Sequence, residues 1–216
     1  MSDLPSPNPD LPLRLKQHTS ALHRLAERSG VMARLLARRL DRAGYVALVC
    51  NLQAIYAALE PMLAGWPPAQ ALAGLGRSGA LSADLRELGP AAAPPVAATR
   101  DYVARLHQAG TDAPHRLVAH AYVRYLGDLH GGQVLQRLVS DLYRLPGEEG
   151  TRFYQFGPPE QVQRLRESVR AWLGDVLLTP AQADEVLDEA RWAFEAHCRM
   201  FEQLDAASPP GPTATA

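Results

Sequence analysis

The positions of glycine and proline, and the residues between them, constrain the fold of this chain most strongly. The segments between these breakers are too long for β-strands, and β-branched runs are absent: isoleucine occurs once, at Ile55, in 216 residues. Apolar residues instead recur at three- and four-residue steps, which is the period of an amphipathic helix. We therefore predict an all-α fold, built as a single-domain helical bundle.

The clearest predicted helix begins at Thr179-Pro180-Ala181-Gln182, which has the pattern of a capping box with proline at the first helical position. A second long helix is predicted from about 41 to 63. The remaining predicted helices cover residues 11–28, 31–39, 82–88, 97–107, 114–143 and 159–173. Residues 1–10 and 207–216 are rich in Pro, Ser, Asp, Thr and Ala, so we expect disordered tails around one domain over 11–206.

Composition excludes several classes of function. The formal net charge is −1, which predicts no broad surface for nucleic acid. The chain does not open with a signal peptide, and no continuous run approaches the roughly 18 apolar residues of a membrane span. We therefore expect a cytoplasmic protein without a membrane segment. Cys50 and Cys198 lie in apolar-patterned stretches, where buried free thiols are a commoner outcome than a disulfide.

Three glycines fall in the middle of the predicted helix over 114–143, at Gly127, Gly131 and Gly132. Each glycine inside a helix costs about 1 kcal/mol relative to alanine. The glycines could mark a simple break with a loop, or a kink where a flat ligand lies directly against the backbone. Asp128 lies inside this segment, where an acidic side chain suits proton chemistry better than packing.

A second set of polar residues shares one face of the predicted helix over 11–28. His23 follows Lys16 by two turns and precedes Glu27 by one turn. A carboxylate in that position can fix the tautomer of a metal-bound imidazole, although a single histidine is more often a structural one. Arg166 and Arg170 are also one turn apart, so they could face one anionic group or form a solvated basic face.

Two of these segments carry a resemblance to a known family. The chain contains His120-Ala121-Tyr122, then Tyr125-Leu126-Gly127-Asp128-Leu129 and Gly131-Gly132-Gln133. With the segment around His23 and with Ile55-Tyr56-Ala57-Ala58-Leu59-Glu60, this pattern resembles the heme oxygenase family from about residue 15 to residue 204. The resemblance implies that heme lies between a proximal helix, which bears His23, and a kinked distal helix.

The resemblance also implies a role for individual residues. His23 would be the iron ligand, and Glu27 would hydrogen-bond the other ring nitrogen. The distal wall would be formed by Gly127, Gly131 and Gly132. Asp128 would hold water near the iron-bound oxygen, in a network with Tyr56 and Arg124. The heme propionates would be held by Lys16, Tyr122, Arg166 and Arg170.

The activity implied by the resemblance is the oxidative cleavage of heme b, which is both cofactor and substrate. Molecular oxygen and electrons would open the ring to biliverdin, carbon monoxide and ferrous iron, for iron acquisition or bilin supply. The electron donor would be a ferredoxin, a flavodoxin or a flavin reductase, acting on a monomer. Positive charge around His23, from Arg14, Lys16, Arg24 and Arg28, could dock a small acidic carrier, although solvated arginines are the commoner outcome.

This chain departs from the family pattern at three positions. His130 stands where the family commonly has serine, which places a titratable ring at the kink. Ser20 replaces a basic residue that often supplements Lys16. His197 occupies a position where an asparagine often joins the distal water network. These departures leave open the in-plane orientation of the heme and therefore which meso carbon is attacked.

Three alternative functions are compatible with an all-α bundle. A heme carrier would bind through His23 without turnover, but it would not need Asp128. A ferritin-like di-iron bundle needs Glu-x-x-His repeats, and none of the seven histidines has a glutamate three residues before it. A thiaminase-type enzyme of related fold would need a catalytic cysteine in its pocket, whereas both cysteines lie on apolar stripes.

Overall fold

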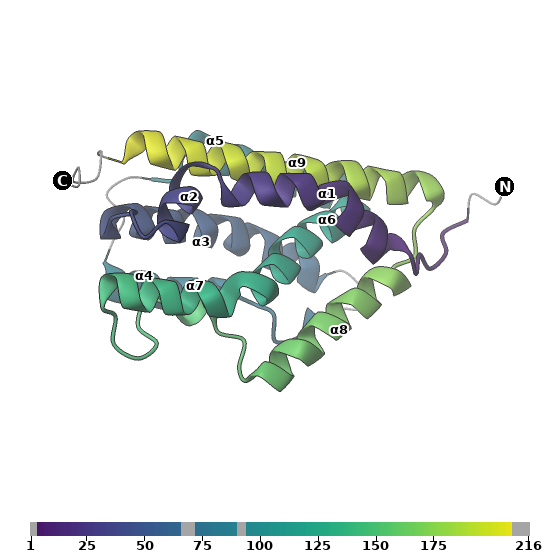
Figure 1. Ribbon diagram of the computed structural model, residues 1–216. Coiled ribbons are helices and arrows are strands. Elements are labelled where there is room, and N and C mark those ends of the chain that lie inside the picture. Colours follow the sequence, from purple (N-terminus) through teal and green to yellow (C-terminus); the bar gives the residue numbers. More distant parts are fainter. Residues whose placement is uncertain (1–3, 66–71, 90–93, 209–216) are drawn as a thin grey trace.

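The computed structural model describes residues 4–65, 72–89 and 94–208. Over these ranges the chain is helical and contains no β-strand, only one isolated bridge between Ser6 and Leu178 (Figure 1). The all-α prediction is confirmed. The elements are α1 (Leu11–Glu27), α2 (Gly30–Leu36), α3 (Arg42–Ala64), α4 (Ser78–Leu88), α5 (Ala97–Asp112), η2 (Pro114–Arg116), α6 (Leu117–Ala121), η3 (Tyr122–Leu126), α7 (Gly127–Tyr143), η4 (Arg152–Tyr154), α8 (Pro159–Asp175) and α9 (Pro180–Ala207).

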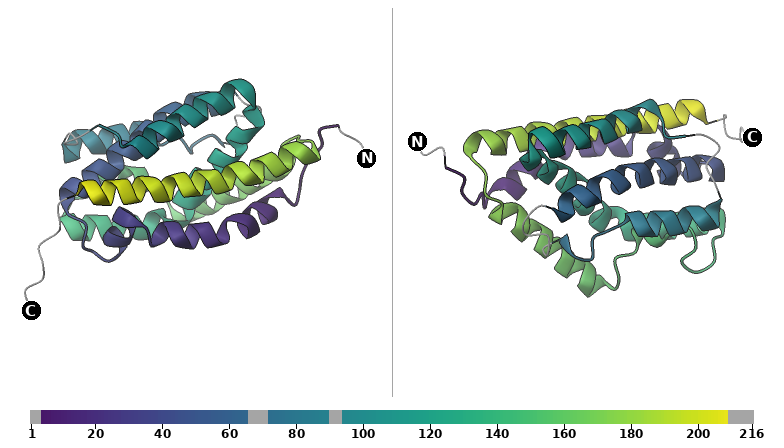
Figure 2. Two further views of the ribbon diagram at one scale, coloured as in Figure 1. Left: turned by 90° about the horizontal axis from the view of Figure 1, so that it is seen from above. Right: turned by 180° about the vertical axis from the view of Figure 1, so that it is seen from behind.

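Helix α9 runs the length of the bundle, with α1 along one side and α5 along the other (Figure 2). Its N-terminus is the predicted capping box: the Thr179 side chain accepts a hydrogen bond from the Gln182 backbone, and the Gln182 side chain accepts one from the Thr179 backbone. The long apolar stripe of α9, which includes Val186, Phe194 and Leu204, is buried against its neighbours. This helix therefore provides the support on which α1, α2 and α5 pack.

Helix α3 is the apolar centre of the bundle and packs against α4 and α5. By length and composition alone it could cross a membrane, since its most apolar window has a mean hydropathy of 1.5. Half of that window is buried inside the protein, and Leu48, Ile55 and Leu59 have no exposed surface. The apolar character of α3 is what a central helix requires, because it must bury surface on several sides.

The N-terminal segment makes backbone hydrogen bonds with a distant part of the chain. The backbone of Ser6 exchanges two hydrogen bonds with the backbone of Leu178, both 3.1 Å long. The backbone N–H of Asn8 donates to the Gly174 carbonyl oxygen at 2.8 Å. These hydrogen bonds join residues 6–8 to the last turn of α8 and to the segment between α8 and α9, while the disordered tails over 1–10 and 207–216 stay predictions. Residues 1–3 and 209–216 of the expected tails lie outside the described residues.

The predicted helix over 114–143 is one nearly continuous helical path, without the loop that the glycines could have marked. Its irregularity lies just before Gly127, where residues Tyr122–Leu126 form a π-helical turn. A π turn inserts an extra residue into the helical repeat and changes the direction of the axis. Figure 1 shows this change of direction between α6 and α7. The kink therefore exists, but a π turn whose side chains are buried except for the half-buried Tyr122 produces it, and the glycines follow in a regular α-helix.

Candidate functional site

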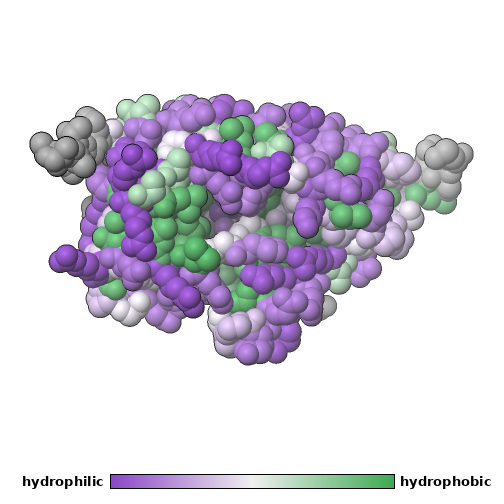
Figure 3. Space-filling view, in the orientation of Figure 1, coloured by the Kyte–Doolittle hydropathy of each residue, from purple (hydrophilic) through white to green (hydrophobic). Residues whose placement is uncertain are grey.

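Two adjoining cavities of about 390 and 400 Å³ lie between α1 and the path from η3 to α7. They share part of their walls, namely His23, Val123, Gly127, His130 and Phe194. In the view of Figure 3 this face of the molecule is hollowed near its centre, with hydrophobic side chains around the hollow and hydrophilic ones beyond them. The size and the mostly apolar lining are typical of a site for a small organic ligand.

The predicted glycines divide into two groups. A Cβ atom added at Gly127 would meet nothing within 4 Å, and one at Gly131 would meet only a Leu135 methyl group at 3.9 Å. Both residues line the cavity, so bare backbone faces open space there. Gly132 does not line it: a Cβ atom at Gly132 would lie 3.0 Å from the Tyr154 carbonyl oxygen. Gly132 lets the segment that bears Phe153 and Tyr154 pack against α7, and those two rings complete the wall.

His23 lies on α1 and borders both cavities. Its side chain is 49% exposed, and its Nδ1 is 3.6 Å from a Glu27 carboxylate oxygen, which is too long for a hydrogen bond. The imidazole also meets the Phe194 ring edge to face, with centroids 5.9 Å apart. Because Nδ1 faces Glu27, Nε2 is the nitrogen left for a ligand in the cavity. Few contacts hold this side chain in place.

Asp128, Arg124 and Tyr56 form a buried network on the opposite wall. Arg124 donates from Nη2 to Asp128 Oδ1 at 3.0 Å and from Nε to the Tyr56 hydroxyl at 3.3 Å. The Tyr56 hydroxyl in turn donates to Asp128 Oδ2. The side chains of Arg124 and Asp128 are each 10% exposed, and Tyr56 has no exposed surface. Three elements, α3, η3 and α7, thus bring together the three residues that the sequence assigned to one network.

Burial sets the electrostatics of this network. It raises the pKa of Asp128 well above its ordinary value and lowers the pKa of Arg124 to about 10. Arg124 still carries its charge at neutral pH, and at 3.0 Å it favours the carboxylate form of Asp128. A carboxyl group whose pKa is raised by burial, and which is held in place by two donors, is suited to receive and return a proton.

The other cavity has a polar, cationic end. Lys16, Arg24 and Arg170 border it, and the Tyr122 hydroxyl is 3.0 Å from the Thr19 hydroxyl within its wall. Arg166 lies outside both cavities and donates from Nε to the Leu129 carbonyl oxygen at 3.2 Å. In this structure a backbone acceptor on α7 takes the Arg166 guanidinium while Arg170 borders the cavity, and the expectation that the two face one anionic group stays a prediction.

His130 projects from α7 into the region that the two cavities share. Its Nδ1 donates to the Leu126 carbonyl oxygen at 2.6 Å, and its Nε2 is 3.2 Å from Arg170 Nη2. Burial lowers the pKa of this histidine, and Arg166, Arg170 and His23 lower it further. A neutral ring with its proton on Nδ1 can accept from Arg170, so His130 connects the distal helix to the cationic end.

Sequence reasoning missed several residues that shape the cavities: Thr19, Phe153, Tyr154 and Phe194. All four are ordinary core or helix-face residues in the sequence, and nothing in their pattern distinguished them. His197 was noted as a departure, and the structure places it in the cavity wall within hydrogen-bond distance of Arg124. Cys50 and Cys198 are free thiols, as expected.

Fold and site together define a class: a protein that is helical over its described residues, with a mostly apolar cavity between its helices. One histidine stands on one wall of that cavity, and a buried carboxylate stands beside bare helical backbone on the other. Comparison with known proteins names the family. The family model described as heme oxygenase matches residues 10–203, so this chain belongs to the heme oxygenase family.

Individual relatives agree with this assignment. The chain is 34% identical to the heme oxygenase of Porphyra purpurea, with 88% of this chain and 85% of the relative covered. It is 35% identical to heme oxygenase 1 of Rattus norvegicus, with 94% and 74% covered. Among solved structures, heme oxygenase-1 from Synechocystis in complex with heme superposes with a TM-score of 0.83 at 30% identity, covering 92% of this chain and 93% of that one.

Proposed function

We propose that this protein binds heme b in the combined cavity and cleaves it, with molecular oxygen and electrons, to biliverdin, carbon monoxide and ferrous iron. The observation that carries the proposal is that two opposite walls of the cavity hold different chemical groups. His23 stands free on α1, and a buried Asp128–Arg124–Tyr56 network lies across the cavity beside the bare backbone of Gly127. A heme carrier needs the first wall but has no use for the second.

The residues present fit heme. A flat ring can lie against Gly127 and Gly131, since no side chain fills the space above them. His23 Nε2 would hold the iron, with Glu27 on the Nδ1 side of the ring. The carboxylates of heme would lie at the cationic end, where Lys16, Arg170 and Tyr122 would bind them, with His130 beside Arg170. Arg166 and Gly132 would act indirectly, through the backbone contacts that position α7.

Bound heme supplies the iron that binds oxygen and the ring that is oxidised. The protein contributes orientation and proton control. Asp128 would hold water in the open space beside Gly127 and pass protons through that water from its carboxyl oxygens. Arg124 and Tyr56 keep those oxygens in place. The Phe153, Tyr154 and Phe194 rings would limit the entry of further water, because they cover the cavity with apolar surface.

The electron donor would be a ferredoxin, a flavodoxin or a flavin reductase. Charge on α1 favours an acidic one: Lys16, Arg24 and Arg28 make no ion pair among the described residues, whereas Arg14 pairs with Asp184 at 2.6 Å. Cationic side chains that stay unpaired beside a cavity can attract an acidic partner. We further propose that the protein acts as a monomer in the cytoplasm.

One experiment separates the enzyme from a carrier. Hemin is added to the purified protein, followed by a reductant and a ferredoxin–reductase pair under oxygen. An enzyme gives a Soret band that disappears while the biliverdin spectrum rises and carbon monoxide is released. A stable Soret band through many equivalents of reductant would contradict the proposed function and would favour the carrier.

A further inference from the structure

We infer that His197 is a positioning residue of the reaction: it fixes the direction of the Arg124 guanidinium, and Tyr102 and a buried cluster of polar side chains hold it from behind. This inference rests on the proposed function, because it concerns the network that would control protons there. It assigns a role to a residue that the pattern of the sequence marked only as a departure.

The first step is the orientation of the His197 ring. Its Nδ1 donates to the Ala193 carbonyl oxygen of the preceding turn of α9 at 2.7 Å. That bond places the proton on Nδ1, so the lone pair of Nε2 points at Arg124 Nη1, 3.0 Å away. The side chain is buried, and burial together with the Arg124 charge lowers its pKa to about 3. His197 is therefore a hydrogen-bond acceptor for Arg124 throughout the physiological pH range.

The second step is what Arg124 would lose without this acceptor. Its three guanidinium nitrogens contact three different groups: Nε the Tyr56 hydroxyl, Nη1 His197, and Nη2 Asp128. With all three contacts the plane of the guanidinium is fixed. Without His197, a buried N–H of Arg124 has no partner, and the group gains by rotating towards water or towards another acceptor. Either movement displaces Asp128, the carboxyl that faces the cavity.

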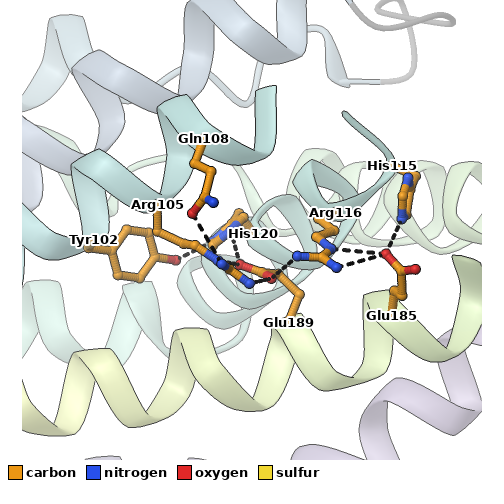
Figure 4. Close-up of polar contacts among 8 residues, drawn as sticks. All are labelled: Tyr102, Arg105, Gln108, His115, Arg116, His120, Glu185 and Glu189. Atoms are coloured by element: carbon orange, nitrogen blue, oxygen red, sulfur yellow. Dashed lines mark hydrogen bonds and ion pairs between the residues drawn. The ribbon is translucent and has the colours of Figure 1, made fainter. Parts of the chain in front are cut away.

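The third step is the support behind His197. The Tyr102 ring meets the His197 ring edge to face, with centroids 5.0 Å apart. Figure 4 shows how Tyr102 is held in turn: its hydroxyl is 2.9 Å from His120 Nδ1, and His120 Nε2 is 3.2 Å from Glu189. Arg105 binds both oxygens of Glu189, at 2.9 and 2.7 Å. Tyr102, His120 and Glu189 are buried, and Arg105 is half-buried.

The position of this cluster explains why it reaches the site. His120 lies on α6, directly before the π turn that bears Arg124, while Tyr102 lies on α5 and Glu189 on α9. The contacts of Glu189, His120 and Tyr102 therefore join α5, α6 and α9 at the start of the π turn. His197 and Arg124 make the next contact along the same two helical paths. The cluster and His197 together fix the position of the Arg124 guanidinium, which extends from the π turn.

The test compares two substitutions at His197. His197→Phe keeps a ring of similar shape but removes the acceptor, whereas His197→Gln can place an amide oxygen near the position of Nε2. We expect His197→Phe to bind heme within about threefold of the wild-type affinity in a Soret titration. Biliverdin formation should fall about 10- to 100-fold, the usual cost of losing a residue that orients a site group. His197→Gln should retain most of the wild-type rate of biliverdin formation.

Two further measurements keep the inference falsifiable. In the heme-free protein, ¹⁵N NMR should show the Arg124 Nε–H signal shifted and exchanging faster with water in His197→Phe, and close to wild type in His197→Gln. Tyr102→Phe, which keeps the ring but removes the hydroxyl, should produce a smaller change in the same signal. Thermal melting of each variant verifies folding.

The outcomes distinguish this inference from the proposed function. If wild type forms no biliverdin, the proposed function is wrong, and the NMR comparison still tests whether His197 orients Arg124. If wild type turns over heme and His197→Phe does so at the same rate with an unchanged Arg124 signal, His197 is only a packing residue. Equal losses in His197→Phe and His197→Gln would also overturn the inference, since the acceptor would then be irrelevant.

Discussion

The two walls of the cavity are built in opposite ways. On α1, the His23 side chain is 49% exposed, and its Nδ1 is 3.6 Å from a Glu27 carboxylate oxygen, too far for a hydrogen bond. Across the cavity, Arg124 and Asp128 are each 10% exposed and bind each other as well as Tyr56. A metal–ligand bond can orient a loosely held imidazole when heme arrives. Proton control needs groups that are already in place, so only the distal wall is organised in advance.

The largest effect is expected from His23→Ala. Biliverdin formation should fall below detection because the iron loses its protein ligand, while some heme still binds through the cationic end and the apolar walls. The midpoint temperature of thermal unfolding should change by less than about 2 °C, because a half-exposed side chain that makes no hydrogen bond with the described residues contributes little to stability. External imidazole should restore part of the activity. His18→Ala on the same helix is the matched control, and an unchanged spectrum and rate in His23→Ala would refute the assignment.

Asp128→Ala should also stop biliverdin formation, by about 100-fold or more, the usual range for losing a positioned acid–base group. Unlike His23→Ala it should destabilise the protein, by about 3–5 kcal/mol, because Arg124 becomes a buried charge without its partner. Asp128→Asn should recover part of the stability but little of the activity. Denaturant unfolding and product yield are the measurements. Full biliverdin yield from Asp128→Ala would contradict the proposed role.

Two neighbouring glycines allow a matched comparison within the distal helix. Gly132→Ala should cost about 1–3 kcal/mol of stability, since its Cβ would lie 3.0 Å from the Tyr154 carbonyl oxygen. Gly131→Ala should gain up to about 1 kcal/mol from helix propensity. It should nevertheless weaken heme binding, because its methyl group occupies the space that the ring would use. Equal effects of the two substitutions on both stability and heme affinity would show that the two faces do not differ.

The distal wall should also make stability depend on pH. The pKa of His197 is lowered from 6.5 to about 3 in the folded protein, so the unfolded chain binds its proton first as acid is added. Stability from this group is present above pH 6.5 and is lost as pH falls towards 3, at a rate of at most about 1.4 kcal/mol per pH unit. Urea unfolding between pH 7 and pH 4.5 should show a flatter profile for His197→Gln. Parallel profiles would contradict the buried, neutral state of His197.

The smallest effect is expected at the proximal surface. Replacing Arg28, which borders neither cavity, with glutamine should slow turnover with an acidic ferredoxin about twofold or more at low salt and leave heme affinity unchanged. The difference should vanish at 1 M salt, where the screening length is about 3 Å. Stopped-flow reduction at several ionic strengths measures it. Turnover that does not depend on ionic strength would exclude electrostatic docking on this face.

The sequence by itself determined the helical class and most helix positions, and through the family resemblance it indicated the residues of the distal network. These rest on local chemistry: the period of the apolar residues, the capping box at Thr179, and a run around Gly127 and Asp128 specific enough to carry a family resemblance. Helix propensity and capping act within a few residues, so a linear pattern contains them. His23 and Glu27 share a face for the same reason, because four residues make about one turn.

Only the tertiary structure decided which members of similar pairs serve the cavity. Gly131 faces open space while Gly132 packs against Tyr154, and Arg170 borders the cavity while Arg166 binds a backbone carbonyl. Each pair has the same residue type on one helix, and the difference depends on the rotation of that helix against its neighbours. For the glycines, the helix is α7, which continues directly from the π turn at Tyr122–Leu126; that turn also contacts α8 and α9, which are far from it in the chain. No local pattern encodes such contacts, because they form only when the π turn, α8 and α9 meet.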